Sequence, residues 1–364
     1  MRLFSPSPAL QERESRPRSL AGASFALGAK GRLLPLSIPM RFFGAAVVFH
    51  LVAWIALGLG AGHVPRFAGG IGWPLAALHA LTLGVLAMGA IGASLQLLPV
   101  ATLQPLRWRG APALVWWLYA PGVAALVVGM AAQRPTWMAI AALPVFGALA
   151  LYAVLLSRNL AGARGMPGVR AQGWLALASL ALLLLSAAAM LAAWIGAAAT
   201  SRDTWLMLHV VSAVFGFMGA LALGLANILV PMFALGPVPS DQSQLRIAAL
   251  GAVALALTLP VALGVWPRPA ALAAVAVAGL AVALHLLSMR AVLRAGMRRD
   301  LGGSFVLVRT GWAALVLTVA LAAWWSLDGD RPGLTTAQAS SASCRSSRRC
   351  TWPASPAARR RRRR

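Results

Sequence analysis

The chain has 364 residues, of which 60% are hydrophobic and only 11% are charged. Soluble domains are about half apolar and about a quarter charged, so this composition excludes a soluble enzyme. The formal net charge of +25 would suggest nucleic-acid binding in a soluble protein. In a membrane protein, however, basic residues record topology, and their positions have to be considered first.

Long apolar segments follow one another along the chain. A transmembrane helix needs about 20 mainly apolar residues, and stretches rich in Arg, Pro or Gly separate nine such segments: 42–62, 72–99, 112–132, 136–156, 173–199, 205–233, 246–266, 269–289 and 305–327. None of them alternates with period two over ten residues, as the strands of an outer-membrane barrel do. We therefore predict an all-α, polytopic transmembrane bundle of about nine spans.

The basic residues predict the orientation of this bundle. With residues 1–41 on the inner side, the inner segments hold 18 of the 32 Lys and Arg residues, and the outer loops hold four: Arg66, Arg134, Arg202 and Arg268. Such a bias is typical of a cytoplasmic N-terminus. The charge is thus explained by topology, and nucleic acid is not a predicted partner.

Both ends of the chain differ in composition from the bundle. Residues 1–40 are basic and we predict them to be disordered, either as a transit peptide or as an over-extended start before Met40. Residues 331–364 are rich in Ser, Ala, Pro and Arg and place ten arginines on the outer side. Either this tail is cytoplasmic and one helix is miscounted, or the tail is not native. We favour a non-native tail and predict a disordered, non-native segment over 328–364.

Cys344 and Cys350 lie in this tail, and their spacing matches no zinc or c-type haem motif.

The first four spans resemble the next four, which indicates an internal duplication. Landmarks of the second span recur in the sixth at a constant offset of 132: Gly84, Gly92 and Pro99 match Gly216, Gly224 and Pro231. We predict a first four-helix repeat over 41–160, a second over 172–295 and an extra ninth helix over 304–327. A repeat with an even number of helices keeps its orientation, so the two copies are expected to be parallel.

Titratable side chains inside a bilayer are costly and therefore suggest function. All seven acids and the single lysine lie outside the predicted spans, which leaves four histidines within them: His50, His79, His209 and His285. His50 and His285 lie toward the inner side, and they form a metal-ligand pair or are hydrogen-bonded core histidines. The second description is the more frequent one for a lone histidine.

His79 and His209 lie near the outer starts of the second and sixth spans. Small residues follow both of them at helical spacing. These residues either permit close helix packing or make room for a flat macrocycle that the histidine coordinates. Arg66 and Arg202, in the adjoining outer loops, are candidate partners for haem propionates.

Two segments carry a family resemblance. Segment 79–100 (HALTLGVLAMGAIGASLQLLPV) resembles the haem-ligating helix of haem-copper oxidase subunit I and its short membrane relatives, and segment 209–233 (HVVSAVFGFMGALALGLANILVPMF) resembles a second signature of those relatives. NnrS-type haem and copper proteins of denitrifying bacteria are a neighbouring family. The resemblance implies that His79 is an axial haem ligand, that His209 is a second haem or metal ligand, and that the membrane is a bacterial inner membrane.

The resemblance does not extend to oxygen reduction with proton pumping. An oxidase needs an adjacent His-His pair and a nearby tyrosine, whereas this chain has no His-His pair and only Tyr119 and Tyr152. The implied function is a haem-binding membrane protein, with b-type haem and with copper as a further candidate. Its partner would be a redox protein or a gaseous ligand such as nitric oxide or oxygen, and any enzymatic activity would be oxidoreductase-like. The alternatives are a small-solute transporter or channel built of parallel repeats and a non-catalytic assembly subunit.

Overall fold

The structure is a computed structural model that describes residues 31–67, 69–108, 110–197, 202–298 and 301–327. The predicted tail 328–364, with Cys344 and Cys350, and most of the predicted N-terminal segment 1–40 lie outside these residues. Every regular element in the described part of the chain is helical. The prediction of an all-α polytopic bundle is confirmed.

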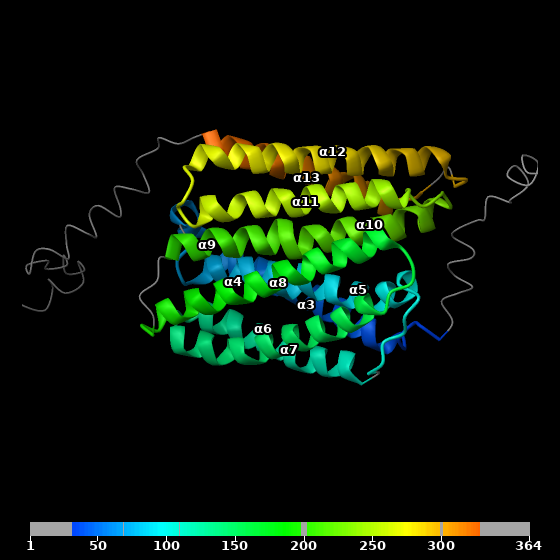
Figure 1. Cartoon of the computed structure of the whole chain (residues 1–364). Helices are drawn as coiled ribbons and strands as arrows, with labels where there is room; N and C mark the ends of the chain where they lie inside the picture. The colour runs from blue at the N-terminus through cyan, green and yellow to red at the C-terminus, as the bar shows by residue number, and fades with distance from the viewer. Residues whose placement is uncertain (1–30, 68, 109, 198–201, 299–300, 328–364) are drawn as a thin grey trace, which may run out of the picture.

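Nine helical segments in the described ranges are long and apolar enough to cross a membrane. Their elements, in chain order, are α3 Ser37–Leu59, α4 Trp73–His79, η2 Ala80–Ala87, α5 Met88–Ala101, α6 Ala111–Ala131, α7 Pro135–Ala161, α8 Pro167–Trp194, α9 Arg202–Val211, η3 Ser212–Met218, α10 Gly219–Ala234, α11 Asp241–Ala262, α12 Ala271–Ala295 and α13 Ser304–Leu327. Short 3-10 turns, η1 Ala61–Arg66 and η4 Arg268–Ala270, lie in two of the connections. The chain is therefore a multi-pass membrane protein whose helices lie side by side (Figure 1).

Several helices extend beyond the apolar segments from which they were predicted. α8 begins at Pro167 instead of residue 173, α11 begins at Asp241 instead of 246, and α12 continues to Ala295 instead of 289. The reason is that hydropathy locates only the part of a helix within hydrocarbon, whereas capping decides where the helix ends. Pro167 occupies the first turn of α8, and the Ser240 hydroxyl accepts a hydrogen bond from the Ser243 amide at the start of α11.

Two spans contain long π-helical stretches. η2 joins α4 to α5 in the second span, and η3 joins α9 to α10 in the sixth. A π-helix is rare, and it is frequently found at functional sites. Because η2 begins at Ala80 and η3 at Ser212, the two stretches are separated by the same offset of 132 residues as the matched glycines.

Glycines in these two spans allow the preceding helices to pack closely against them. A Cβ atom on Gly84 would collide with Phe49 of α3, and one on Gly216 would collide with Ser179 of α8. A second glycine, eight residues further along each span, repeats the arrangement with a partner seven residues before the first partner: Gly92 lies against Phe42, and Gly224 lies against Gln172. Small residues that let two backbones approach are typical of helix contacts in membranes. The same set of contacts therefore occurs in both predicted repeats.

The helices differ in how much of their surface is covered. The main apolar core joins α3 through α10. α13 buries only Phe305 and Ser326 and packs mainly along α12. Near its far end, the Arg268 guanidinium lies 4.1 Å from the centre of the Trp325 ring. α12 and α13 thus form an edge of the bundle, as Figure 1 shows.

Arginines gather at one end of the bundle, where α3 begins and α12 ends. We call it the arginine-rich end; its described arginines are Arg32, Arg41, Arg107, Arg158, Arg164, Arg170, Arg246, Arg290, Arg294, Arg298 and Arg309. The opposite end, where α4 and α9 begin, has four arginines among the described residues: Arg66, Arg134, Arg202 and Arg268. His79 and His209 lie toward this second end.

Candidate functional site

The structure brings His79 and His209 together. His79 is the last residue of α4, directly before η2, and His209 lies in α9, three residues before η3. The centres of their imidazole rings are 6.3 Å apart, and the ring planes are inclined by 32°. Two histidines separated by 130 residues in the chain therefore lie close together where the two π-helical stretches begin.

The hydrogen bonds of the His79 ring define its tautomer. Nδ1 of His79 lies 3.1 Å from the carbonyl oxygen of Leu75. A carbonyl oxygen only accepts, so Nδ1 carries the proton and Nε2 carries the lone pair. This bond also fixes the direction of the ring, because Leu75 lies one helical turn before it.

The His209 ring is held in a similar way by a side chain of the neighbouring helix α8. Nδ1 of His209 lies 3.5 Å from the Ser186 hydroxyl oxygen. That hydroxyl already donates its single hydrogen to the Leu183 carbonyl, at 2.9 Å, so it accepts from His209. Nε2 therefore carries the lone pair in this ring as well. Nε2 of His79 has no hydrogen-bond partner among the residues that the structure describes, whereas the His209 ring also interacts with the Leu183 carbonyl.

The distance between the rings matches a metal ion held from both sides. A metal–imidazole bond is about 2.0 Å, and the nitrogen lies roughly 1 Å from the ring centre, which places the ring centres roughly 6 Å apart around a shared metal. A direct hydrogen bond between the two rings would bring the centres to roughly 5 Å. The observed 6.3 Å agrees with the first arrangement.

The set of donor atoms distinguishes among metals. No group of three or more His, Cys, Asp or Glu side chains that could hold a metal ion occurs in the described ranges. A bare zinc or copper ion in a protein is usually bound by three or four side chains. Haem iron needs only axial ligands from the protein, since the macrocycle supplies the other four nitrogens. A pair of imidazoles alone therefore fits haem better than an isolated copper ion.

Part of the small-residue surface near the histidines has another explanation. Gly216 is one of the small residues that could make room for a macrocycle. Ser179 of α8, however, occupies the space that a Cβ atom on Gly216 would take. Close helix packing therefore explains this glycine. Gly89, two residues after the end of η2, has no atom within 4 Å of the position of a Cβ.

The other two intramembrane histidines are in unrelated surroundings. His50 is exposed on α3, where its Nε2 accepts a hydrogen bond of 2.9 Å from the Trp54 indole. His285 is buried in α12 with 1% of its surface exposed, and its Nδ1 has no partner. No ring contact joins them among the described residues. His50 is thus bonded within its own helix, and a metal site shared by His50 and His285 stays a prediction.

The two arginines that were considered for propionates lie at the same end as the histidine pair. Arg66 is exposed and ends η1, shortly before α4. Arg202 begins α9, and its side chain is outside the described part of the chain. The roles of Arg66 and Arg202 in binding propionates stay predictions.

Four supporting residues were not predicted from the sequence as parts of the site: Ser186, Tyr119, Tyr152 and Ser94. The Ser186 hydroxyl orients His209, and the buried Tyr119 hydroxyl donates a hydrogen bond of 3.2 Å to the Leu83 carbonyl within η2. Such a donor can satisfy a carbonyl that a π-helical turn displaces. Close by, Tyr152 bonds Ser94 at 2.8 Å and contacts the Phe217 ring of η3 edge-on. In the sequence, Ser186 and Ser94 are single hydroxyls within long apolar runs. This isolation is the only feature of the sequence that could have marked them as supporting residues.

Comparison of the chain with protein-family models, with curated proteins and with solved structures found no match. The functional assignment therefore depends on the geometry of the site and on the motifs quoted above.

Proposed function

We propose that the protein is a membrane haem protein in which His79 and His209 are the two axial ligands of one b-type haem. The observation that carries this proposal is the pair of imidazole rings, whose centres are 6.3 Å apart and whose Nδ1 atoms contact oxygen atoms of Leu75 and Ser186. With both axial positions taken by histidine, electron transfer is favoured over the binding of a diatomic gas. The family resemblance of segments 79–100 and 209–233 supports the same assignment.

The residues around the pair have defined tasks in this proposal. The Leu75 carbonyl and the Ser186 hydroxyl accept hydrogen bonds from the two Nδ1 atoms, which keeps each Nε2 basic and correctly oriented. The apolar helices exclude water from the site, and Arg66 at the near end offers a positive charge for carboxylates. Haem, when bound there, supplies a one-electron iron couple.

The distribution of arginines supports an orientation as well. We infer that the arginine-rich end faces the cytoplasm of a bacterial cell, because cytoplasmic loops carry an excess of Arg and Lys. The His79–His209 pair then lies toward the outer side of the inner membrane. A redox partner would exchange electrons with the site from that side.

Haem binding is tested directly on the purified full-length protein. We expect an absorption spectrum with a six-coordinate, low-spin haem signal and a pyridine haemochrome assay that gives about one b-type haem per chain. Because both axial positions are occupied, carbon monoxide should change the reduced spectrum little. Absence of haem after expression with a sufficient haem supply would contradict the proposal, and stoichiometric copper without haem would favour the copper-binding alternative.

A second expected result concerns Ser186, which contacts the ring of His209 but not the proposed metal. Ser186→Ala should increase the haem dissociation constant by about 10- to 100-fold, the usual effect of losing a hydrogen-bond partner of a metal-bound histidine. Haem transfer to apomyoglobin measures this change. Ser157→Ala is the matched control, because that exposed hydroxyl bonds only the Val154 carbonyl of its own helix. Equal rates of haem loss in the two variants would show that Ser186 does not hold the ligand.

A further inference from the structure

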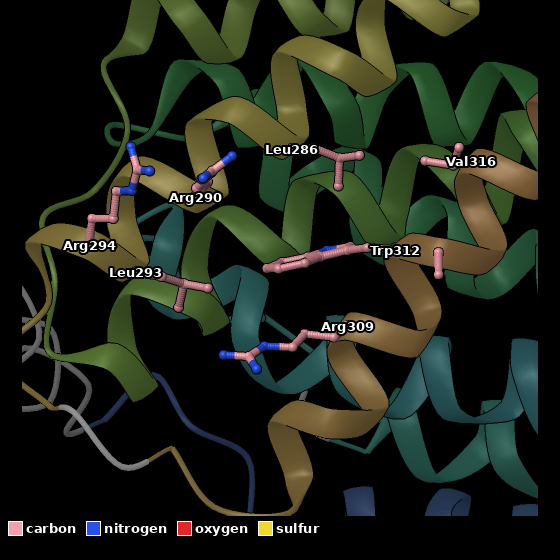
Figure 2. A pocket seen from close by; sticks show the side chains of 8 residues that line it. Leu286, Arg290, Leu293, Arg294, Arg309, Trp312 and Val316 are labelled. Carbon is pink, nitrogen blue, oxygen red and sulfur yellow. The ribbon is translucent and has the colours of Figure 1, made fainter.

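A groove separates α12 from α13 at the arginine-rich end. Its volume is about 660 Å³, and Figure 2 shows side chains of the two helices facing it. The lining residues that matter here are Arg290, Leu293 and Arg294 of α12 and Arg309, Trp312 and Val316 of α13. The volume is within the range of about 300–1,000 Å³ that small-molecule sites occupy.

The groove combines three positive charges with no compensating acid. Within the described residues, the guanidinium groups of Arg290, Arg294 and Arg309 have neither an ion-pair nor a hydrogen-bond partner. Asp241 on α11 is the only acid whose side chain the structure describes. Three unpaired guanidinium groups on facing helices repel one another, so an anion between them would be bound favourably. Guanidinium groups bind phosphate oxygens in pairs of parallel hydrogen bonds.

The depth of these arginines corresponds to the boundary between lipid headgroups and hydrocarbon. Arg290 lies five residues before the end of α12, and Arg309 lies five residues after the start of α13. At 1.5 Å per residue, both are about 7–8 Å inside the helix ends. Trp312 lies one turn deeper than Arg309, and tryptophan is enriched at this interface.

The remainder of the groove is apolar and open to the side of the bundle. Leu293 and Val316 line it beyond the arginines, and most of α13 is exposed. A free inorganic anion would use the charges but not this apolar surface. A molecule with a phosphate and a hydrocarbon chain would use both.

We propose that this groove binds one anionic phospholipid. Its phosphate lies among Arg290, Arg294 and Arg309, and an acyl chain follows Leu293 and Val316 between the two helices. Basic pockets between transmembrane helices on the cytoplasmic side bind acidic lipids by the same chemistry. The lipid would fill the gap beside α13, which has few other contacts with the bundle. This site lies toward the opposite end of the bundle from the histidine pair and does not depend on haem.

Native mass spectrometry of the full-length protein in a neutral detergent tests the proposal. The probes are phosphatidylglycerol, phosphatidylcholine with the same acyl chains, and inorganic phosphate. We expect one phosphatidylglycerol to be bound at least tenfold more tightly than phosphatidylcholine. Since a basic residue near a membrane surface is worth about a fivefold change in binding, replacing Arg290, Arg294 and Arg309 together with Gln should weaken phosphatidylglycerol binding by about 100-fold.

A matched control removes three charges from the same end but outside the groove. Arg41, Arg164 and Arg246 are exposed there, and replacing all three with Gln should leave the bound phosphatidylglycerol within about twofold of the wild type, since none of them lines the groove. If the triple groove variant does not yield folded protein, Arg309→Gln alone suffices, because α13 contributes little to the core; it should weaken binding by about fivefold. Equal retention of both lipids, unchanged binding by the groove variants, or displacement of the lipid by millimolar inorganic phosphate would each overturn the assignment.

Discussion

Replacement of His79 with alanine is expected to abolish haem binding while leaving the helical bundle folded. A hydrogen-bond partner of a metal-bound histidine is worth about 10- to 100-fold in affinity, so loss of the histidine itself should weaken haem binding by more than about 100-fold. The absorption spectrum and haemochrome content of the purified variant measure this loss. His79 is only partly buried, and removal of its ring should affect folding less than removal of a fully buried side chain.

His209→Ala should give the same loss, because the proposal assigns one haem to both rings. Two other histidines serve as controls: His63 is exposed in η1, and His50 is exposed on α3 with its Nε2 bound to Trp54. Their alanine variants should retain haem at the level of the wild type. A His79→Ala protein with full haem content and an unchanged spectrum would refute the assignment of the ligand. Loss of haem in His50→Ala instead would place the ligand on α3.

Gly84→Leu is expected to cause the largest loss of stability among substitutions in the π-helical spans. A side chain at this position would have to occupy the space of Phe49, which is itself buried in the core. Overpacking a core costs about 1–3 kcal/mol and more where the neighbour cannot move. We therefore expect at least about 3 kcal/mol, seen as a large decrease in Tm in detergent and a poor yield of monodisperse protein.

Gly89→Leu is the matched control for this variant. Gly89 lies five residues further along the same span, and nothing lies within 4 Å of the position of its Cβ atom. Its replacement should change stability by no more than about 1 kcal/mol, the difference in helix propensity between Gly and other residues. Equal Tm values for the two variants would show that α3 does not pack against the second span as described. A parallel loss in Gly216→Leu, where Ser179 is the obstacle, would extend the result to the sixth span.

The histidine pair illustrates which part of the site was predictable. Helical periodicity and hydropathy placed His79 and His209 near the starts of two spans on one side of the membrane, and the structure has them there. Their ring separation of 6.3 Å was not predictable, because it depends on how α4 and α9 pack within the bundle. The role of Ser186 was also not predictable, because it depends on how a third helix, α8, packs against His209. The surroundings of His50 and His285 were not predictable either, because sequence position gives the depth of a side chain in the membrane but not the direction in which it faces.

The sequence by itself determined the class of the protein and the positions of its spans. Each span needs its own run of apolar residues, which is a local property, and the nine predicted segments agree with the nine helices of the described residues. The tertiary structure alone decided the rest: the π-helical stretches η2 and η3, the glycine contacts with Phe49 and Ser179, and the arginine-lined groove beside α13. These features arise from contacts between helices that are far apart in the chain, and in a bilayer such contacts depend on close fit between surfaces, because all the helices are similarly apolar.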